Sequence, residues 1–177
     1  MSESEIPPVD WQSLLFKAAK DGDIKTVQEA LDHGAGINDA GESQLEEALR
    51  CAVWRGHLDI VRFLLEKGAQ VNKKQDRGET AIFVSCHTGN LELTQLLIDA
   101  GAEVNIANRS GITPLMNAAG PGGNLKLVQL LVEHGADIQA KGEWDYDAVY
   151  FSVKEDHPEI VEFLVEKGRL NTGYVLE

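Results

Sequence analysis

The sequence of 177 residues lacks any run of the roughly 18 to 20 consecutive apolar residues that a membrane-spanning helix needs. Its opening residues, 1–5, hold no basic group and lead into no apolar stretch, so we expect no signal peptide. Cysteine is scarce: Cys51 and Cys86 are the only two, and both lie within helical patterns. A disulfide framework needs closely paired cysteines in a secreted context, so these absences favour the reducing cytoplasm.

Basic residues are also in the minority, since 16 Lys and Arg against 29 Asp and Glu give a net charge of −13. This balance argues against binding to nucleic acid or to an anionic membrane surface, both of which favour a basic face. Residues 1–50 carry −7 and residues 141–177 carry −5, whereas residues 51–140 carry only −1. The hydrophobic content of 43% and charged content of 25% are those of an ordinary globular domain with a sizeable core.

The sequence does contain an internal repeat. Five glycines spaced 33 or 34 residues apart each close a similar phrase: Gly34, Gly68, Gly101, Gly135 and Gly168. A second position lies 12 residues upstream in every unit and holds Gly22, Gly56, Gly89, Gly123 and, in the fifth unit, Asp156. Two registers that repeat together indicate a tandem array of one structural unit.

Each unit predicts two short helices joined at the upstream position. Small residues precede the turn and apolar residues follow it at helical spacing, as in Leu58, Ile60, Val61, Leu64 and Leu65. The closing glycine suits a left-handed helix cap, which most side chains resist. An alanine and a β-branched residue follow, as at 102–104, and lead the chain into an extended hairpin.

The fourth unit reads GITPLMNAA over 111–119 and NLKLVQLLVEHGADI over 124–138, and it resembles the ankyrin repeat. Thr113 there suits a helix N-cap and Pro114 the first helical position. The resemblance covers about residues 10–171 and implies an all-α solenoid of five stacked helix-turn-helix units with β-hairpin-like connecting loops. We therefore expect a disordered lead at 1–9, repeats at 10–40, 41–74, 75–107, 108–141 and 142–171, and a tail at 172–177.

Several residues depart from the family pattern. The family's TPLH tetrapeptide survives only at 113–116, where Met116 replaces the histidine, so that histidine's hydrogen bonds are not expected here. One extra residue lies in the turn at 120–123 and another in the connection around 39–46. The fifth unit lacks the alanine after Gly168, which suits a terminal repeat that faces water on one side.

A catalytic or metal-dependent alternative would use Cys86 and His87 together with His57. Adjacent side chains on a helix point about 100° apart, so Cys86 and His87 do not face each other. The glycines at 120–123 lack the pattern of a phosphate-binding loop, and the five histidines occupy stacked positions rather than one ligand cage. We expect no enzyme activity, no metal and no cofactor.

The resemblance implies a partner-binding concave face built from hairpin tips and first helices. The family's variable positions beside the hairpin glycine correspond to Asp76, Arg77, Glu79, Arg109, Ser110, Ile112, Glu143, Trp144 and Tyr146. Those before the inter-helix turn correspond to Lys20, Asp21, Trp54, Arg55, His87, Thr88, Lys154 and Glu155.

Trp, Tyr and Arg are enriched at binding hot spots, so we predict Trp54 and Arg55, followed by His87 and Thr88, as the centre of the site. The alternatives are that Trp54 packs against Trp11 or between neighbouring first helices, and that Trp144 and Tyr146 seal the last hairpin over the core.

The resulting prediction is a non-catalytic protein–protein interaction module, a cytoplasmic adaptor or inhibitor that is a monomer when free. The acidic balance favours a basic protein partner, and a narrower version is an immunity-type inhibitor of a basic toxin or nuclease. Two other classes stay open at this point: the thiol- or metal-dependent enzyme, and a structural protein that continues its own stack by self-association.

Overall fold

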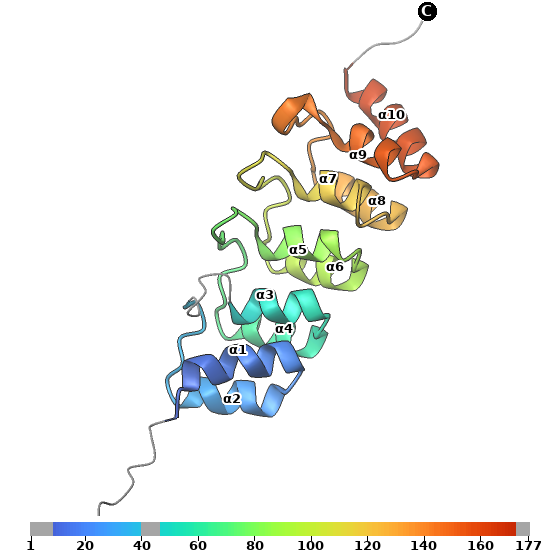
Figure 1. Ribbon diagram of the computed structural model, residues 1–177. Coiled ribbons are helices and arrows are strands. Elements are labelled where there is room, and N and C mark those ends of the chain that lie inside the picture. The colour runs from blue at the N-terminus through green and yellow to red at the C-terminus, as the bar shows by residue number, and fades with distance from the viewer. Residues whose placement is uncertain (1–8, 40–46, 173–177) are drawn as a thin grey trace, which may run out of the picture. The chain divides into compact units, whose positions relative to one another are not determined.

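The computed structural model describes residues 9–39 and 47–172, with side chains to residue 168. Within these ranges the chain forms ten α-helices and one short 3-10 helix, and no strand (Figure 1). The predicted all-α class is therefore confirmed. Residues 1–8, 40–46 and 173–177, which hold most of the predicted lead and tail and the extra residue near 39–46, lie outside the described part. The chain divides into two compact units, residues 1–69 (unit 1) and 70–177 (unit 2).

Unit 1 contains two helix pairs, formed by α1 (Trp11–Asp21) with α2 (Ile24–Asp32) and α3 (Ala48–Arg55) with α4 (Leu58–Glu66). The first helices α1 and α3 pack on each other, as do the second helices α2 and α4. Asp10 and Asp23 cap α1 and α2 by accepting hydrogen bonds from backbone amides of the first turn. The core of unit 1 consists of fully buried side chains that include Leu15, Val27, Leu49, Ile60 and Leu64.

Unit 2 contains three helix pairs and a 3-10 helix: α5 (Ala81–His87) with α6 (Leu91–Asp99), α7 (Pro114–Ala119) with α8 (Leu125–Glu133), η1 (Glu143–Asp145), and α9 (Ala148–Lys154) with α10 (Pro158–Thr172). The first helices α5, α7 and α9 contact one another in order and form one layer. The second helices α6, α8 and α10 do the same and form the other layer. The pairs follow each other in chain order (Figure 1).

The repeat places equivalent leucines in the core of unit 2. Leu97 on α6, Leu131 on α8 and Leu164 on α10 are all 0% exposed, and they occupy the same position of successive second helices. Each is covered by its own pair and by the neighbouring pair, which is why a repeat of this kind is stable only when stacked.

Polar side chains begin the first helices of unit 2 at spacings of 33 and 34 residues. Thr80, Thr113 and Asp147 each accept a hydrogen bond from the backbone amide three residues later. The predicted N-cap at Thr113 and first helical position at Pro114 are confirmed. The Thr113 amide also donates to the Met116 sulfur over 3.4 Å, so the residue that replaces the family histidine keeps one bond to the N-cap backbone.

The connections between pairs in unit 2 are hairpin-like, as predicted, although they contain no assigned strand. An amide donates to a carbonyl across each hairpin: Gln75 to Glu79 over 3.0 Å, Asn108 to Ile112 over 2.9 Å and Gly142 to Tyr146 over 2.8 Å. Neighbouring tips are joined too, since the Arg109 amide donates to the Arg77 carbonyl and the Glu143 amide to the Ser110 carbonyl. The hairpins project from the same side of the helices of unit 2 (Figure 1).

Glycine is needed at the hairpin tips for two reasons. Gly78 and Gly111 have φ of +77° and +72°, a left-handed conformation that costs other residues about 1 to 2 kcal/mol. In addition, a Cβ on Gly111 would lie 3.0 Å from the Gly142 Cα of the next hairpin. Asp145 occupies the corresponding tip position of the last hairpin with φ of +61°, next to Trp144 with φ of +62°.

Gly168 does not end its helix, and the prediction of a left-handed cap there is wrong. Helix α10 continues through Gly168 to Thr172. The four earlier closing glycines have φ between 84° and 94°: Gly34, Gly68, Gly101 and Gly135. The last three of them lead into the hairpins at 75–79, 108–112 and 142–146. In the second, third and fourth helix pairs, the closing glycine is followed by a buried alanine with 8 to 9% exposure. Arg169 stands at this position in the fifth, and a long charged side chain is costly to bury there.

Candidate interaction surface

Trp54 and Arg55 form the last turn of α3 in unit 1, and both are exposed. Their neighbours Ala52 and Val53 fill the core, so the helix turns the next two side chains outward. Trp54 is 48% exposed, a large fraction for a tryptophan. Trp11 stacks instead on the His33 ring, with ring centroids 4.0 Å apart and planes inclined by 16°. Lys20 and Asp21, at the end of α1, are exposed as well.

The hairpins of unit 2 present a row of tips, residues 76–79, 109–112 and 143–146, which we call the tip row. The exposed members are Asp76, Arg77, Arg109, Glu143, Trp144, Asp145 and Tyr146, and the half-buried ones include Glu79, Ser110 and Ile112. The tip-to-tip backbone bonds place these residues side by side. The first two tips carry one arginine each, whereas the third carries two carboxylates and two aromatic rings and no base.

His87 and Thr88 end α5 and are exposed, as predicted for binding positions. The Nδ1 atom of His87 lies 3.4 Å from the Asn117 amide oxygen on α7, and the Asn117 amide nitrogen donates to the Phe83 carbonyl. Both contacts hold α5 against α7. Trp54 and Arg55 belong to unit 1 and His87 and Thr88 to unit 2, so their action as one centre stays a prediction.

The last hairpin and helix α9 carry a cluster of aromatic rings, of which only Tyr146 was predicted from the sequence as a surface residue. The rings of Tyr146 and Tyr150 stack with centroids 3.7 Å apart and planes within 3°, and Phe151 meets both rings edge-on. Tyr146 is 36% and Tyr150 38% exposed, whereas Trp144 is 83% exposed and does not seal the core. Tyr150 was absent from the predicted surface, because its partner Tyr146 precedes the helix and helical spacing does not relate the two residues.

Two electrostatic contacts hold this cluster in place. Lys141 donates to the Asp147 carboxylate over 2.8 Å, and Asp147 caps α9 by accepting from the Tyr150 amide over 2.9 Å. Partial burial acts to raise the pKa of Asp147, but the hydrogen bonds from Lys141 and the Tyr150 amide outweigh it and lower the pKa. The hydrogen bond with Tyr150 raises the pKa of Tyr146.

Cys86 and His57, named for the catalytic alternative, have structural surroundings within their own units. Cys86 is fully buried, and burial raises the pKa of its thiol to about 12, so no thiolate nucleophile is present at neutral pH. His57 and His157 each contact a backbone carbonyl of the preceding pair over 3.1 Å, those of Lys20 and Gly120 respectively. In the described part of the chain, no three His, Cys, Asp or Glu side chains are grouped to hold a metal ion.

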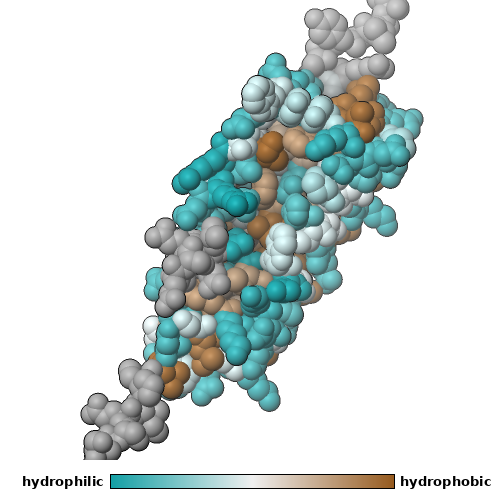
Figure 2. Space-filling model, viewed as in Figure 1, coloured by the Kyte–Doolittle hydropathy of each residue, from teal (hydrophilic) through white to brown (hydrophobic). Residues whose placement is uncertain are grey.

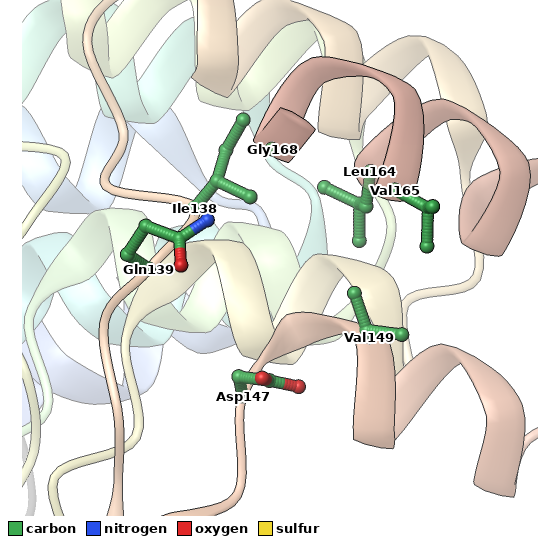
Figure 3. A pocket seen from close by; sticks show the side chains of 7 residues that line it. All are labelled: Ile138, Gln139, Asp147, Val149, Leu164, Val165 and Gly168. Atoms are coloured by element: carbon green, nitrogen blue, oxygen red, sulfur yellow. The ribbon is translucent and has the colours of Figure 1, made fainter. Parts of the chain in front are cut away.

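A cavity of about 260 Å³ lies between the segment after α8 and helices α9 and α10 (Figure 3). It is lined by Ile138, Gln139, Asp147, Val149, Leu164, Val165 and Gly168. Its size is below the range of about 300 to 1,000 Å³ usual for small-molecule sites. Its one carboxylate is already bound to Lys141, so the cavity offers no group for chemistry.

The surface visible in Figure 2 is mainly hydrophilic and has scattered apolar residues rather than one broad hydrophobic patch. None of the helices in the described ranges has the length and apolar character needed to cross a membrane. The exposed residues that stand out are therefore the aromatic and arginine side chains at the ends of first helices and in the tip row.

Curated relatives match parts of this chain. A 2-5A-dependent ribonuclease of Mus musculus is 34% identical over 77 residues, which cover 44% of this chain and 10% of the mouse protein. The probable E3 ubiquitin-protein ligase XBOS33 of Oryza sativa subsp. japonica is 38% identical over 73 residues, 41% of this chain and 14% of the rice protein. The ankyrin repeat-containing protein P1E11.10 of Schizosaccharomyces pombe is 36% identical over 70 residues, 40% of this chain and 33% of the yeast protein.

The matched stretches thus span a third or less of these relatives. A protein-family model described as ankyrin repeats (three copies) matches residues 5–75, 71–142 and 110–173, which together take in nearly the whole chain. Helix pairs joined by hairpin-like loops, with their glycines in register, agree with that match. The chain belongs to the ankyrin repeat family.

Proposed function

We propose that this protein is a non-catalytic adaptor or inhibitor that binds one folded protein through its hairpin tips and the ends of its first helices. Ankyrin repeats are generally protein–protein interaction modules, and the family is generally non-catalytic. The observation that carries the proposal is the exposure of Trp54 beside Arg55, at a position where the family varies its residues. Such residues dominate binding energy at protein interfaces.

The proposal includes the residues named from the sequence in both units. Trp54 and Arg55 form its contribution from unit 1, and the contribution from unit 2 comprises Arg77, Glu79, His87, Thr88, Arg109, Ile112, Trp144 and Tyr146. We further propose that the protein has five repeats, that it is located in the cytoplasm and that it is a monomer when free. The five closing glycine positions support the number of repeats.

The net charge supports a basic partner. A protein of −13 attracts cationic surfaces at a distance and repels acidic competitors, which speeds encounter with the correct partner. Exposed charges farther apart than about 8 Å are largely screened at physiological salt, so the effect lies mainly in the association rate. An immunity-type inhibitor of a basic toxin or nuclease is the narrower form of this proposal.

The test begins with affinity capture of the partner from the native host, followed by binding kinetics of the Trp54→Ala/Arg55→Ala variant. We expect the double variant to weaken binding by about 2 kcal/mol or more, the usual cost of truncating a central hot spot. Arg62→Ala, at an exposed arginine of the second helix α4, is the matched control and should leave affinity unchanged. Equal affinity of the double variant and the control would remove Trp54 and Arg55 from the site.

A salt series on the same pair of proteins tests the charge argument. The association rate should fall as salt rises, while the dissociation rate changes little. An association rate that ignores salt, or a strongly acidic partner, would contradict the proposed preference for a basic protein. Sedimentation of the free chain at several concentrations distinguishes the monomer from a self-associating stack.

A further inference from the structure

The third hairpin of unit 2 differs from the other two in chemistry, although the same backbone bond closes it. Its tip holds Trp144 and Tyr146, and Tyr150 on α9 stacks on Tyr146. We call these three side chains the aromatic patch. Phe151 closes the patch from below, edge-on to both tyrosines, so the exposed ring faces are the part available to a partner.

Three bonds fix the hairpin and the start of the helix that carry the patch. The Gly142 amide donates to the Tyr146 carbonyl over 2.8 Å, and the Glu143 amide donates to the Ser110 carbonyl over 3.0 Å. The bridge from Lys141 to Asp147 fixes the start of α9, which carries Tyr150. A surface arranged before binding loses little conformational freedom when a partner docks.

The segment that carries the patch has more acids than bases, although the charges of Lys141 and Lys154 act on Asp145 and Tyr146 respectively. Glu143 and Asp145 flank Trp144 in sequence, and both are exposed. Residues 141–156 contain five acids and two bases, and one of those bases, Lys141, is already engaged by Asp147. The other, Lys154, lies 3.9 Å from the Glu155 carboxylate, a loose contact at the surface.

We infer that the aromatic patch and its carboxylates bind an arginine-containing segment of the partner protein, a conclusion that rests on the proposed function. A guanidinium group stacks flat on an aromatic ring and can donate at its edge to a carboxylate. An apolar partner would desolvate the Glu143 and Asp145 carboxylates, which is costly even though the Lys141 charge acts on Asp145, and an acidic partner would be repelled. The arrangement therefore selects for a planar cation.

The experiment uses the full ¹⁵N-labelled chain and follows its tryptophan indole signals by NMR. The chain has three tryptophans, and Trp144→Phe assigns the signal of Trp144. The added peptide is acetyl-Arg-Gly-Arg-Gly-Arg-amide, compared with the corresponding Lys, Glu and Ser peptides. The Trp144 signal should shift saturably with the arginine peptide, less with lysine, and not with glutamate or serine.

Two variants test the two halves of the site. Glu143→Gln/Asp145→Asn removes the charges with little change of shape, and Tyr150→Leu removes one stacked ring. Each variant should lower the affinity for the arginine peptide about tenfold, which is the scale of one lost charged or aromatic contact. Val153→Ala is the control, because Val153 is 62% exposed on the same helix yet lines a different cavity, with Pro158 and Val161.

If the chemical shift of the Trp144 indole does not change when the arginine peptide is added, the inference is overturned. A shift of equal size with the glutamate peptide also overturns it. Unchanged affinity in both variants overturns it too. These outcomes test the arginine site alone and do not test the proposed function. If a captured partner is still weakened by Trp54→Ala/Arg55→Ala, the proposed function stands while the arginine site is rejected.

Discussion

The fourth and fifth helix pairs follow one backbone plan but place different residues at the same two turns. The fourth pair uses Gly111 at its hairpin tip and Gly123 between its helices, with φ of +72° and +38°. The fifth uses Asp145 and Asp156, with φ of +61° and +59°. In the fourth pair each glycine also touches the pair that follows: a Cβ on Gly123 would lie 2.5 Å from the His157 ring.

This difference separates two requirements that glycine usually meets together. One is the left-handed backbone, which aspartate tolerates better than most residues because its short side chain bonds locally. The other is close approach of a neighbouring pair, where a Cβ would force the Gly142 backbone or the His157 ring to shift. Aspartate at 145 and 156 meets the first requirement at some cost. The side chain of Asp145 also adds charge next to Trp144 of the aromatic patch.

The largest expected effect comes from the shared core. Leu131→Ala and Leu164→Ala should each lower the free energy of unfolding by about 2 to 5 kcal/mol through lost burial and a new cavity. Leu131→Ala should lower the free energy of unfolding more than Leu164→Ala does. The reason is that α8 is packed between α6 and α10, whereas Leu164 borders the cavity of Figure 3. Urea unfolding of both variants, with Val153→Ala as an exposed control, measures this. A larger loss at Leu164 would contradict the order.

Exchanging residue types between the two hairpin tips should have opposite effects. Gly111→Ala should destabilise by about 1 to 3 kcal/mol, because the left-handed backbone and the contact with Gly142 both oppose a Cβ. Asp145→Gly should stabilise by up to about 1 kcal/mol, since strain is relieved but the unfolded chain gains freedom. Thermal unfolding of the two variants tests this. A neutral Gly111→Ala would mean that the tip rearranges freely.

The histidine that joins the two pairs should have a moderate effect. His157→Ala removes the contact between its Nε2 atom and the Gly120 carbonyl, and should cost about 0.5 to 1.5 kcal/mol. His134→Ala, at the exposed end of α8, is the matched control and should change stability by less. Urea midpoints for the two variants settle the comparison, and equal values would show that the bond contributes nothing.

The smallest effects are expected at the tip side chains. Arg109→Ala and Glu143→Ala should each change stability by no more than about 0.5 kcal/mol. Their backbone amides, which alanine retains, make the tip-to-tip bonds to Arg77 and Ser110. The measurement is again the urea midpoint. If either change cost more than Leu131→Ala, the assignment of core and tip positions would be wrong.

Much of the fold was predictable because its signals are local. The double glycine register predicted the helix pairs, and Thr113 with Pro114 predicted the start of α7. The leucines of the second helices were recognisable as core from helical spacing alone. The prediction failed at Gly168, where the residues after the glycine, rather than the glycine itself, decide whether the helix ends.

The candidate surface was predictable in part. Exposure of Trp54, Arg55, His87 and Thr88 agrees with their place at the ends of first helices. The stacking of Tyr150 on Tyr146 was missed, because Tyr150 lies in a helix and its neighbour lies in the hairpin before it. Binding itself remains a prediction for all of these residues.

The sequence by itself determined the repeating unit, the helix caps and the division into buried and exposed faces, since these depend on residues within one turn or one repeat. Only the tertiary structure decided which glycines touch a neighbouring pair, that Trp144 stays exposed while Tyr146 and Tyr150 stack, and that α10 continues through Gly168. The physical reason is that packing is a contact between segments distant in the chain. A periodic pattern records that a side chain faces inward, but not which atoms it meets there.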